Sequence, residues 1–198
     1  MSALLLTILA AGLYIINRFD EGLTPDRRTG IVILAGVPAG AYFGWRAAIQ
    51  SGILPALLLE VVIGCLLLAC ITDCATCQVY RFVWWISGGA ALLLLGVEGW
   101  PEGERLWGLA LFCFLQLILF SHMYGKGDCH AFCVCAAVEA AAGMDFTGFL
   151  IHMLVSFSLL AAVQVARGNV SRKGSLKHPV PFLPYITISF LVVLLFFS

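Results

Sequence analysis

Long hydrophobic runs dominate the chain, and breaks that contain polar residues, glycine or proline separate them. A membrane-spanning helix needs about 20 mostly apolar residues, with about 17 to 25 as the usual range. Measured against this length, the runs predict eight helices, several of them short: residues 3–17, 31–49, 52–72, 82–97, 105–122, 129–143, 147–166 and 181–197. The second run is interrupted by three glycines and a proline. The expected fold class is all-α, a polytopic transmembrane helical bundle of about eight helices.

The composition agrees with an integral membrane protein. Hydrophobic residues make up 62% of the 198 residues and charged residues only 11%, whereas a soluble domain carries about 25% charged residues. The formal net charge is zero, so nothing indicates a nucleic-acid partner. Five of the eight cysteines lie in apolar runs, where cysteine behaves as a small hydrophobic residue, so they do not suggest a disulfide framework: Cys65, Cys70, Cys113, Cys133 and Cys135.

The basic residues predict the orientation, because cytoplasmic loops are enriched in Lys and Arg. The segments that follow the first, third, fifth and seventh predicted helices hold nine of the eleven: Arg18, Arg27, Arg28, Arg81, Lys126, Arg167, Arg172, Lys173 and Lys177. The other segments hold only Arg46 and Arg105. We therefore expect the odd-to-even loops to face the cytoplasm and both termini to lie outside.

Four acidic residues lie within or at the border of the predicted helices: Glu60, Asp73, Asp128 and Glu139. Acidic groups at membrane depth are costly and are candidates for function. Asp73 ends the third helix and Asp128 starts the sixth, so the topology puts both at the cytoplasmic side, where they could share one site. The simpler alternatives are an ordinary helix-end acid for Asp73 and an N-cap for Asp128.

Glu60 and Glu139 lie about three helical turns or more from these aspartates along their own helices. Each is expected to be a buried hydrogen-bonding group or part of a polar seam. A transporter that uses the two glutamates as a proton relay is one alternative function.

Cys74 and Cys77 form a C-x-x-C pair beside Asp73, and Cys129 and His130 follow Asp128. A metal site would need four converging ligands, which nothing in the sequence ensures. A second alternative function is a membrane thiol oxidoreductase that uses Cys74 and Cys77 with a lipid quinone. The expected cytoplasmic position of the pair counts against it.

Three segments carry a resemblance to a known family: ITDCATCQVY at 71–80, YGKGDCH at 124–130 and HPVPFLPYITIS at 178–189. Their order, spacing and positions at helix ends resemble the type IV prepilin peptidases and the archaeal preflagellin peptidases, which are membrane aspartyl proteases. The resemblance covers residues 52–198, a six-helix peptidase domain. Residues 1–51 would then be two additional helices, a reduced remnant of the N-terminal region of larger members.

The resemblance implies a function and a site. Asp73 and Asp128 would be the catalytic pair, and Gly125 and Gly127 the signature glycines. The segment before the last helix would be matched by Val180, Pro181, Phe182 and Pro184. The substrates would be type IV prepilin-like precursors, which have a hydrophobic N-terminal helix. The enzyme would remove their short leader. Cleavage would occur at the cytoplasmic face of the plasma membrane of a prokaryote, without a metal or another cofactor.

The chain departs from the family pattern at two positions. Tyr80 stands at a position where the family usually has proline, and His130 stands at a position where the family usually has lysine. These differences bear on substrate choice more than on reaction type. The loop 18–30 has no cysteine, whereas bifunctional members carry paired C-x-x-C motifs there. N-methylation is therefore not expected.

The chemistry of two aspartates is consistent with peptide hydrolysis. One ionised carboxylate activates water while a protonated partner polarises the carbonyl, and two close carboxyls share a proton. The dipoles of the two predicted helices favour Asp128 as the base and Asp73 as the acid. Glycines at 125 and 127 would leave room for an extended peptide. Lys126 at headgroup level and His130 would also contact the substrate.

Overall fold

The computed structural model describes residues 2–19, 27–168 and 180–197, and this part of the chain contains α-helices and no strand. The eight α-helices are α1 (Ser2–Phe19), α2 (Arg27–Gln50), α3 (Ile53–Thr76), α4 (Arg81–Glu98), α5 (Glu104–Phe114), α6 (Lys126–Ala141), α7 (Phe146–Ala166) and α8 (Leu183–Phe197). A π-helical turn at Leu115–Leu119 and a 3₁₀ turn at Phe120–His122 extend α5. The predicted all-helical class and helix number are confirmed. Arg172, Lys173 and Lys177 lie outside the described residues.

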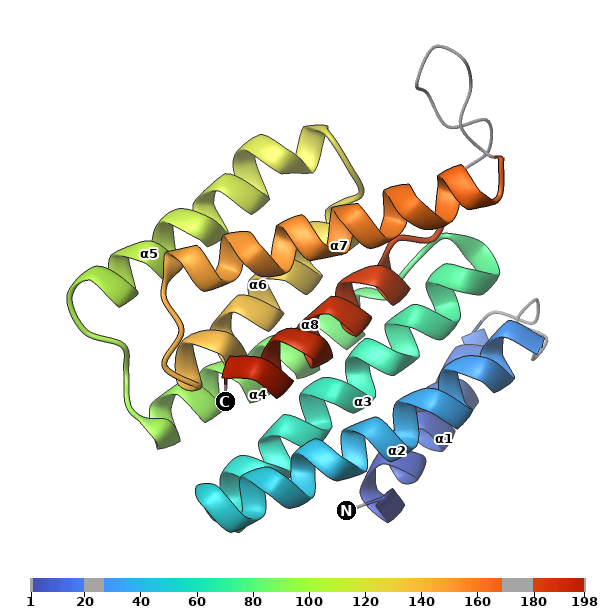
Figure 1. Ribbon diagram of the computed structural model, residues 1–198. Helices are drawn as coiled ribbons and strands as arrows, with labels where there is room; N and C mark the ends of the chain where they lie inside the picture. Colours follow the sequence, from blue (N-terminus) through green and yellow to red (C-terminus); the bar gives the residue numbers. More distant parts are fainter. Residues whose placement is uncertain (1, 20–26, 169–179, 198) are drawn as a thin grey trace.

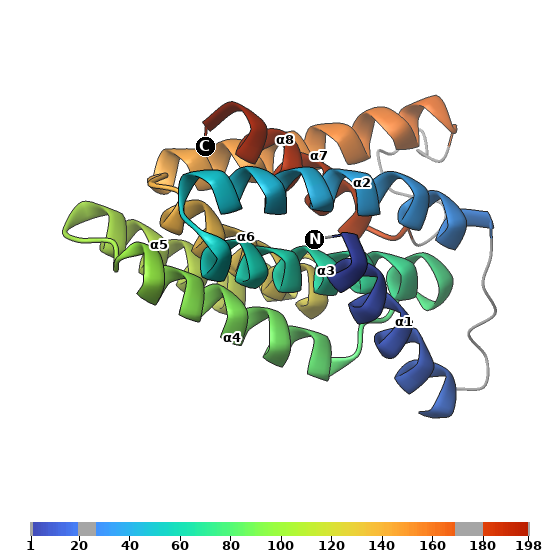
Figure 2. The same ribbon diagram turned by 90° about the horizontal axis from the view of Figure 1, so that it is seen from below.

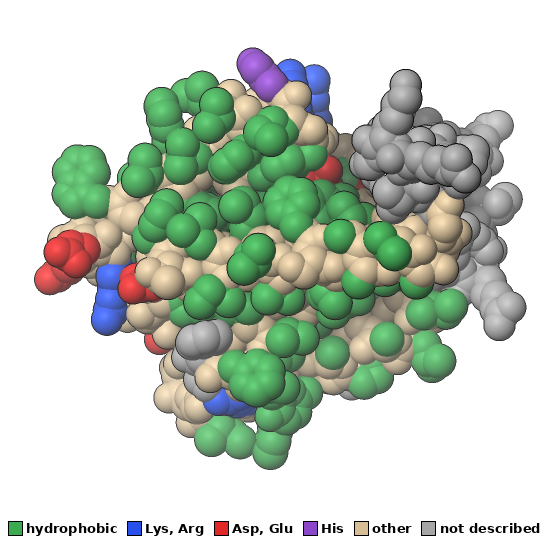
Figure 3. Space-filling model, turned by 45° about the horizontal axis from the view of Figure 1, so that its top comes forward, with side chains coloured by type: hydrophobic (Ala, Val, Ile, Leu, Met, Phe, Trp, Pro, Cys, Tyr) green, Lys and Arg blue, Asp and Glu red, His purple; other side chains and the backbone are tan. Residues whose placement is uncertain are grey.

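Several helices have the length and apolar character that a membrane span requires. Five segments of the described chain meet both conditions: Gly30–Gln50, Ile53–Thr76, Arg81–Glu98, Glu104–His122 and Phe146–Ala166. Two shorter apolar segments belong to α1 and α8, Ala3–Asn17 and Leu183–Phe196. Large hydrophobic side chains cover much of the outer surface, while charged side chains gather near its ends (Figure 3). This architecture is consistent with a multi-pass membrane protein.

The bundle is built around α3 and α6. α3 contacts α1, α2, α4, α6 and α8, and α6 contacts α4, α5, α7 and α8, as Figures 1 and 2 show from two directions. α3 is buried along most of its length from Pro55 to Asp73. α6 has only 16 residues, is not among the long apolar segments, and is nearly enclosed from Cys129 to Ala140. α6 is therefore an internal helix of the bundle.

The glycines that interrupt the second apolar run do not break α2, which continues through Pro38. They allow close packing instead. A Cβ atom at Gly36 would lie 2.3 Å from a methyl group of Leu67, and one at Gly44 would lie 2.5 Å from a carboxyl oxygen of Glu60. Small residues let membrane helices approach one another closely, so these glycines set the distance between α2 and α3.

Two helix boundaries differ from the predicted ones in a way that affects the candidate site. α3 continues to Thr76 and ends where Cys77 adopts a left-handed conformation, with its N–H bonded to the Asp73 carbonyl oxygen at 2.9 Å. α6 begins at Lys126, three residues earlier than expected. As a result, Asp73 lies within the last turn of α3 and Asp128 within the first turn of α6.

Candidate active site

Asp73 points its carboxyl group at the start of α8. Its Oδ2 accepts a hydrogen bond from the backbone N–H of Leu183 at 3.1 Å, and the backbone N–H of Phe182 also interacts with this carboxyl. The first N–H groups of a helix have no partner within the helix, and Asp73 supplies one for α8. The side chain is only 7% exposed. This burial excludes the interpretation of Asp73 as an ordinary solvent-exposed acid at a helix end.

Asp128 occupies the third position of α6, and Gly125 is the N-cap. The simpler alternative, in which Asp128 is the N-cap of this helix, is therefore wrong. Its carboxyl accepts a hydrogen bond from the backbone N–H of Gly125, the arrangement by which an acidic residue at this position caps a helix start. A Cβ atom at Gly125 would lie 2.8 Å from Oδ2 of Asp128. Any side chain at position 125 would therefore displace the Asp128 carboxyl.

The structure brings the two aspartates to the same end of the bundle. The C-terminal end of α3 and the N-terminal ends of α6 and α8 meet there (Figure 1). Asp73 and Asp128 are close enough for the charge of one to act on the other, and the Cys70 thiol interacts electrostatically with both. Cys70 also contacts Thr187 of α8, with 3.1 Å between the sulfur and the hydroxyl oxygen. Carboxyl groups 55 positions apart in the sequence thus form one local cluster.

Aromatic rings hold the start of α8 beside this cluster. The ring of Phe182 lies 4.9 Å from that of Phe157 and 6.0 Å from those of Tyr124 and Phe132, measured between centroids. Phe182 thereby fixes the backbone N–H groups that face Asp73. Burial raises the pKa of the Tyr124 phenol, so it stays protonated and donates a hydrogen bond to Gln116 in the π-helical turn. π-Helical turns are frequent at functional sites. The role of Tyr124 was not foreseen, although it directly precedes the glycine motif.

The other predicted substrate contacts surround Asp128 on the surface. Lys126 and His130 are exposed, and Gly127 is half-buried. The His130 ring stacks on Trp84 of α4 with 6.1 Å between centroids, and its Nδ1 contacts the Lys126 carbonyl oxygen. A Cβ atom at Gly127 would lie 3.8 Å from Val79 and 3.9 Å from Trp84, which are ordinary contact distances. Gly125 and Gly127 are therefore not equivalent, although both belong to the same motif.

The C-x-x-C pair lies beside the cluster. Cys74 is half-buried in the last turn of α3, and Cys77 is exposed at its C-cap. Within the described parts of the chain, no three His, Cys, Asp or Glu side chains converge as metal ligands would.

Glu139 lies deep in the bundle and pairs with a histidine that the sequence analysis did not consider. Its Oε1 is 2.7 Å from Nδ1 of His152 on α7, and both side chains are buried. Nε2 of His152 contacts the Ile186 carbonyl oxygen at 3.1 Å. The pair therefore joins α6, α7 and α8, as a polar seam would. The signal that could have revealed it is the lone histidine in the apolar run 147–166, since intramembrane ionisable residues tend to pair.

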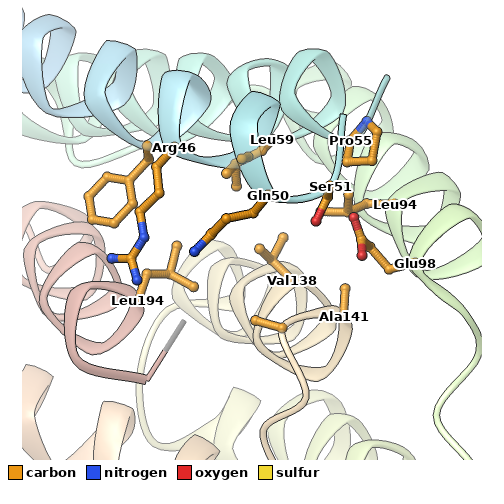
Figure 4. Close-up of a pocket in the computed structure, with 13 residues that line it drawn as sticks. Arg46, Gln50, Ser51, Pro55, Leu59, Leu94, Glu98, Val138, Ala141 and Leu194 are labelled. Carbon is orange, nitrogen blue, oxygen red and sulfur yellow. The ribbon is translucent and has the colours of Figure 1, made fainter. Parts of the chain in front are cut away.

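Glu60 has a different environment. It is fully buried against Gly44 of α2, and neither carboxyl oxygen has a hydrogen-bond partner within the described residues. A pocket of about 320 Å³ lies nearby, into which Arg46 and Gln50 point from α2 while Glu98 lies across it (Figure 4). Neither Glu60 nor Glu139 lines this pocket. The pocket therefore provides no polar connection between the two glutamates.

Comparisons of the chain with protein-family models, with curated proteins and with solved structures find no match. The geometry of the site, together with the motifs, is therefore the basis for assigning a function.

Proposed function

We propose that this protein is a membrane-embedded aspartyl endopeptidase and that Asp73 and Asp128 are its catalytic pair. The observation that carries the proposal is their convergence: two carboxyls from α3 and α6 interact at one end of the bundle, and backbone N–H groups at the start of a helix orient each of them. A pair of interacting carboxyls is the arrangement that acid–base hydrolysis of a peptide bond requires.

The hydrogen bonds suggest which carboxyl takes which role. Asp73 accepts two backbone N–H bonds from α8 and Asp128 accepts one from Gly125, and such bonds are strongest to a charged acceptor. We therefore assign the negative charge to Asp73 and the shared proton to Asp128. This reverses the roles expected from the dipoles of α3 and α6 alone, because that argument did not include the N-terminus of α8.

Hydrolysis then follows the general acid–base scheme. Asp73 takes a proton from a water molecule as the water oxygen attacks the carbonyl carbon of the peptide bond. Asp128 gives its proton to the carbonyl oxygen. In the second step, the proton on Asp73 passes to the leaving nitrogen as the carbon–nitrogen bond breaks. Asp128 recovers a proton from the tetrahedral intermediate, so both groups return to their starting states.

The substrate class comes from the resemblance to prepilin and preflagellin peptidases. The substrates would be prepilin-like precursors, in which a short leader precedes a hydrophobic helix. The exposed backbone at Gly125 beside half-buried Asp128 leaves room for an extended peptide at the catalytic pair. Lys126 and His130 lie on the same turn of α6 and would contact the leader.

The position in the membrane is part of the proposal. Nine of the eleven basic residues belong to the sequence segments that follow the first, third, fifth and seventh predicted helices. The aspartates lie where α3 ends and α6 begins, so we assign this end of the bundle to the cytoplasm. Both termini then lie outside, and the site opens at the cytoplasmic face of a prokaryotic plasma membrane. The leader of a newly made precursor would reach it there.

Co-expression with a prepilin-like precursor from the source organism tests the function. We expect Asp73→Asn and Asp128→Asn each to insert and fold but to leave the precursor uncleaved, because asparagine keeps the size of aspartate and removes its acid–base chemistry. Precursor and product are separated by gel mobility, and protein levels are followed in membranes.

Asp145→Asn is the matched control. Asp145 is the N-cap of α7, where its side chain accepts the Gly148 N–H at 3.1 Å, and it belongs to the α6–α7 loop at the opposite end of the bundle (Figure 1). This variant should process the precursor normally. Wild-type processing by either Asp73→Asn or Asp128→Asn would overturn the assignment of the pair.

A further inference from the structure

An apolar groove of about 720 Å³ runs between α2 and α8, with α3 as its floor. Figure 1 shows α2 and α8 on either side of α3. Ala35 and Ala39 contribute to the α2 wall, Ile188 and Leu191 to the α8 wall, and Leu67 and Cys70 to the floor. We refer to this feature as the α2–α8 groove.

One end of the α2–α8 groove lies beside the candidate active site, although neither aspartate lines it. Cys70 and Cys74 lie in its floor, within one helical turn on either side of Asp73. The Cys70 thiol interacts with both catalytic aspartates. Among the described residues that line the groove, Arg167, at this same end, is the only one with a charged side chain. The charged end of the groove is therefore the end near the catalytic pair, and most of the other lining residues are apolar.

The groove is long enough to hold part of a membrane-spanning helix. Its α2 wall extends from Ile31 to Phe43, which is about 18 Å at 1.5 Å per residue. α2 and α8 both run away from the catalytic end (Figure 1), so the groove follows the bundle axis. The wall of α2 presents alanine at positions 35 and 39, and small residues permit close approach of a neighbouring membrane helix.

We infer that the α2–α8 groove binds the hydrophobic helix of the precursor and that α2 is the wall that determines which helix fits. This inference rests on the proposed function. If the scissile bond lies at the start of a hydrophobic helix, that helix must leave the catalytic pair along the bundle axis. The α2–α8 groove is an apolar path that starts within one helical turn of Asp73. α2 is then part of the substrate site rather than part of a remnant.

The proposal gives Gly36 a role in the groove. A Cβ atom at Gly36 would lie 2.3 Å from Leu67 in the floor, so α2 is held against α3 at the middle of the groove. This contact keeps the α2 wall at a fixed distance from α8. An acyl chain of a lipid is the competing occupant, and the experiment below distinguishes it from a precursor helix.

The test compares two substrates and two variants. One substrate is a prepilin-like precursor of the source organism, and the other is a soluble peptide with the same leader and cleavage site but polar residues in place of the hydrophobic helix. Ala39→Phe fills the groove, whereas Leu34→Phe adds a ring on the lipid-facing side of the same helix, where Leu34 is 80% exposed. We expect Ala39→Phe to lower the ratio of precursor to peptide cleavage rates about tenfold and Leu34→Phe to leave it unchanged.

Cross-linking identifies the occupant directly. A photoreactive amino acid at position 39, placed in an Asp73→Asn background to prevent turnover, should cross-link to the hydrophobic helix of the precursor in membranes. The same group at position 34 should not. Cross-links from position 39 to lipid alone, or an unchanged cleavage ratio in Ala39→Phe, would overturn the groove proposal while leaving the catalytic assignment intact. If the wild-type protein cleaves neither substrate and position 39 captures no precursor, the proposed function itself is wrong.

Discussion

The two glycines of the YGKGD segment should respond differently to alanine, and this difference is the sharpest prediction from the candidate site. At Gly125, φ and ψ are −60° and 141°, a conformation that alanine adopts without strain. The obstacle is steric, because a Cβ atom at this position would lie 2.8 Å from Oδ2 of Asp128. At Gly127, the nearest contacts of a Cβ atom would be ordinary, at 3.8 and 3.9 Å.

The size of the effect follows from these distances. To restore an ordinary contact of 3.4 Å, the Asp128 carboxyl oxygen would have to move by about 0.6 Å. Misplacing a catalytic group by about 1 Å costs about 100-fold in rate, so we expect Gly125→Ala to slow precursor cleavage by about 10- to 100-fold. Stability should change little, because a short side chain moves rather than the backbone, and alanine as an N-cap costs about 1 kcal/mol or less relative to glycine.

Gly127→Ala is the matched control. Position 127 lies in the first turn of α6, where alanine is about 0.5 to 1 kcal/mol more favourable than glycine. We expect this variant to cleave the precursor within a few-fold of the wild-type rate. The measurements are the rate of precursor cleavage in membranes and the thermal unfolding of the purified protein in detergent. A wild-type rate for Gly125→Ala, or equal losses for the two variants, would refute the reasoning.

Two further predictions concern residues outside the carboxyl pair. Replacing both Cys74 and Cys77 with serine should leave most of the precursor cleavage intact, and a chelator should not inhibit cleavage. Loss of cleavage in a folded double variant would instead favour a thiol or metal mechanism. Replacing His152 with alanine leaves Glu139 buried without its partner, so we expect about 3 kcal/mol lower stability. Replacing both His152 and Glu139 with apolar residues of similar volume should restore the stability. Unfolding curves of the single and double variants in detergent would measure both effects.

The number of helices and the overall class follow from the sequence alone. Apolar runs of spanning length leave the backbone no alternative to helix in a membrane, because every N–H and C=O group must be satisfied within the segment. The breaks between runs then set the helix count. The sequence also ranks Asp73 and Asp128 as candidates, since acidic residues at the ends of apolar runs are costly to place there.

The helix boundaries at the site depend on local contacts that hydropathy does not register. Lys126 and Asp128 are polar, so the hydrophobic pattern starts the helix at residue 129, whereas Gly125 and Asp128 cap it three residues earlier. The same limitation applied to α2. Its glycines and proline resemble interruptions in the sequence, but α2 continues through Pro38, and Gly36, Gly40 and Gly44 lie against side chains of α3.

Only the tertiary structure decides which groups meet. α3 is apolar on every side and buried along most of its length, so no pattern within it indicates which face contacts α8 or α6. The hydrogen bond from Leu183 to Asp73 joins residues 110 positions apart, and it changes the role we assign to Asp73. The Glu139–His152 pair and the α2–α8 groove likewise arise from three helices each. The physical reason is that, in an apolar solvent, hydrophobicity does not distinguish the inner face of a helix from the outer one, so small residues and polar contacts between helices determine the packing.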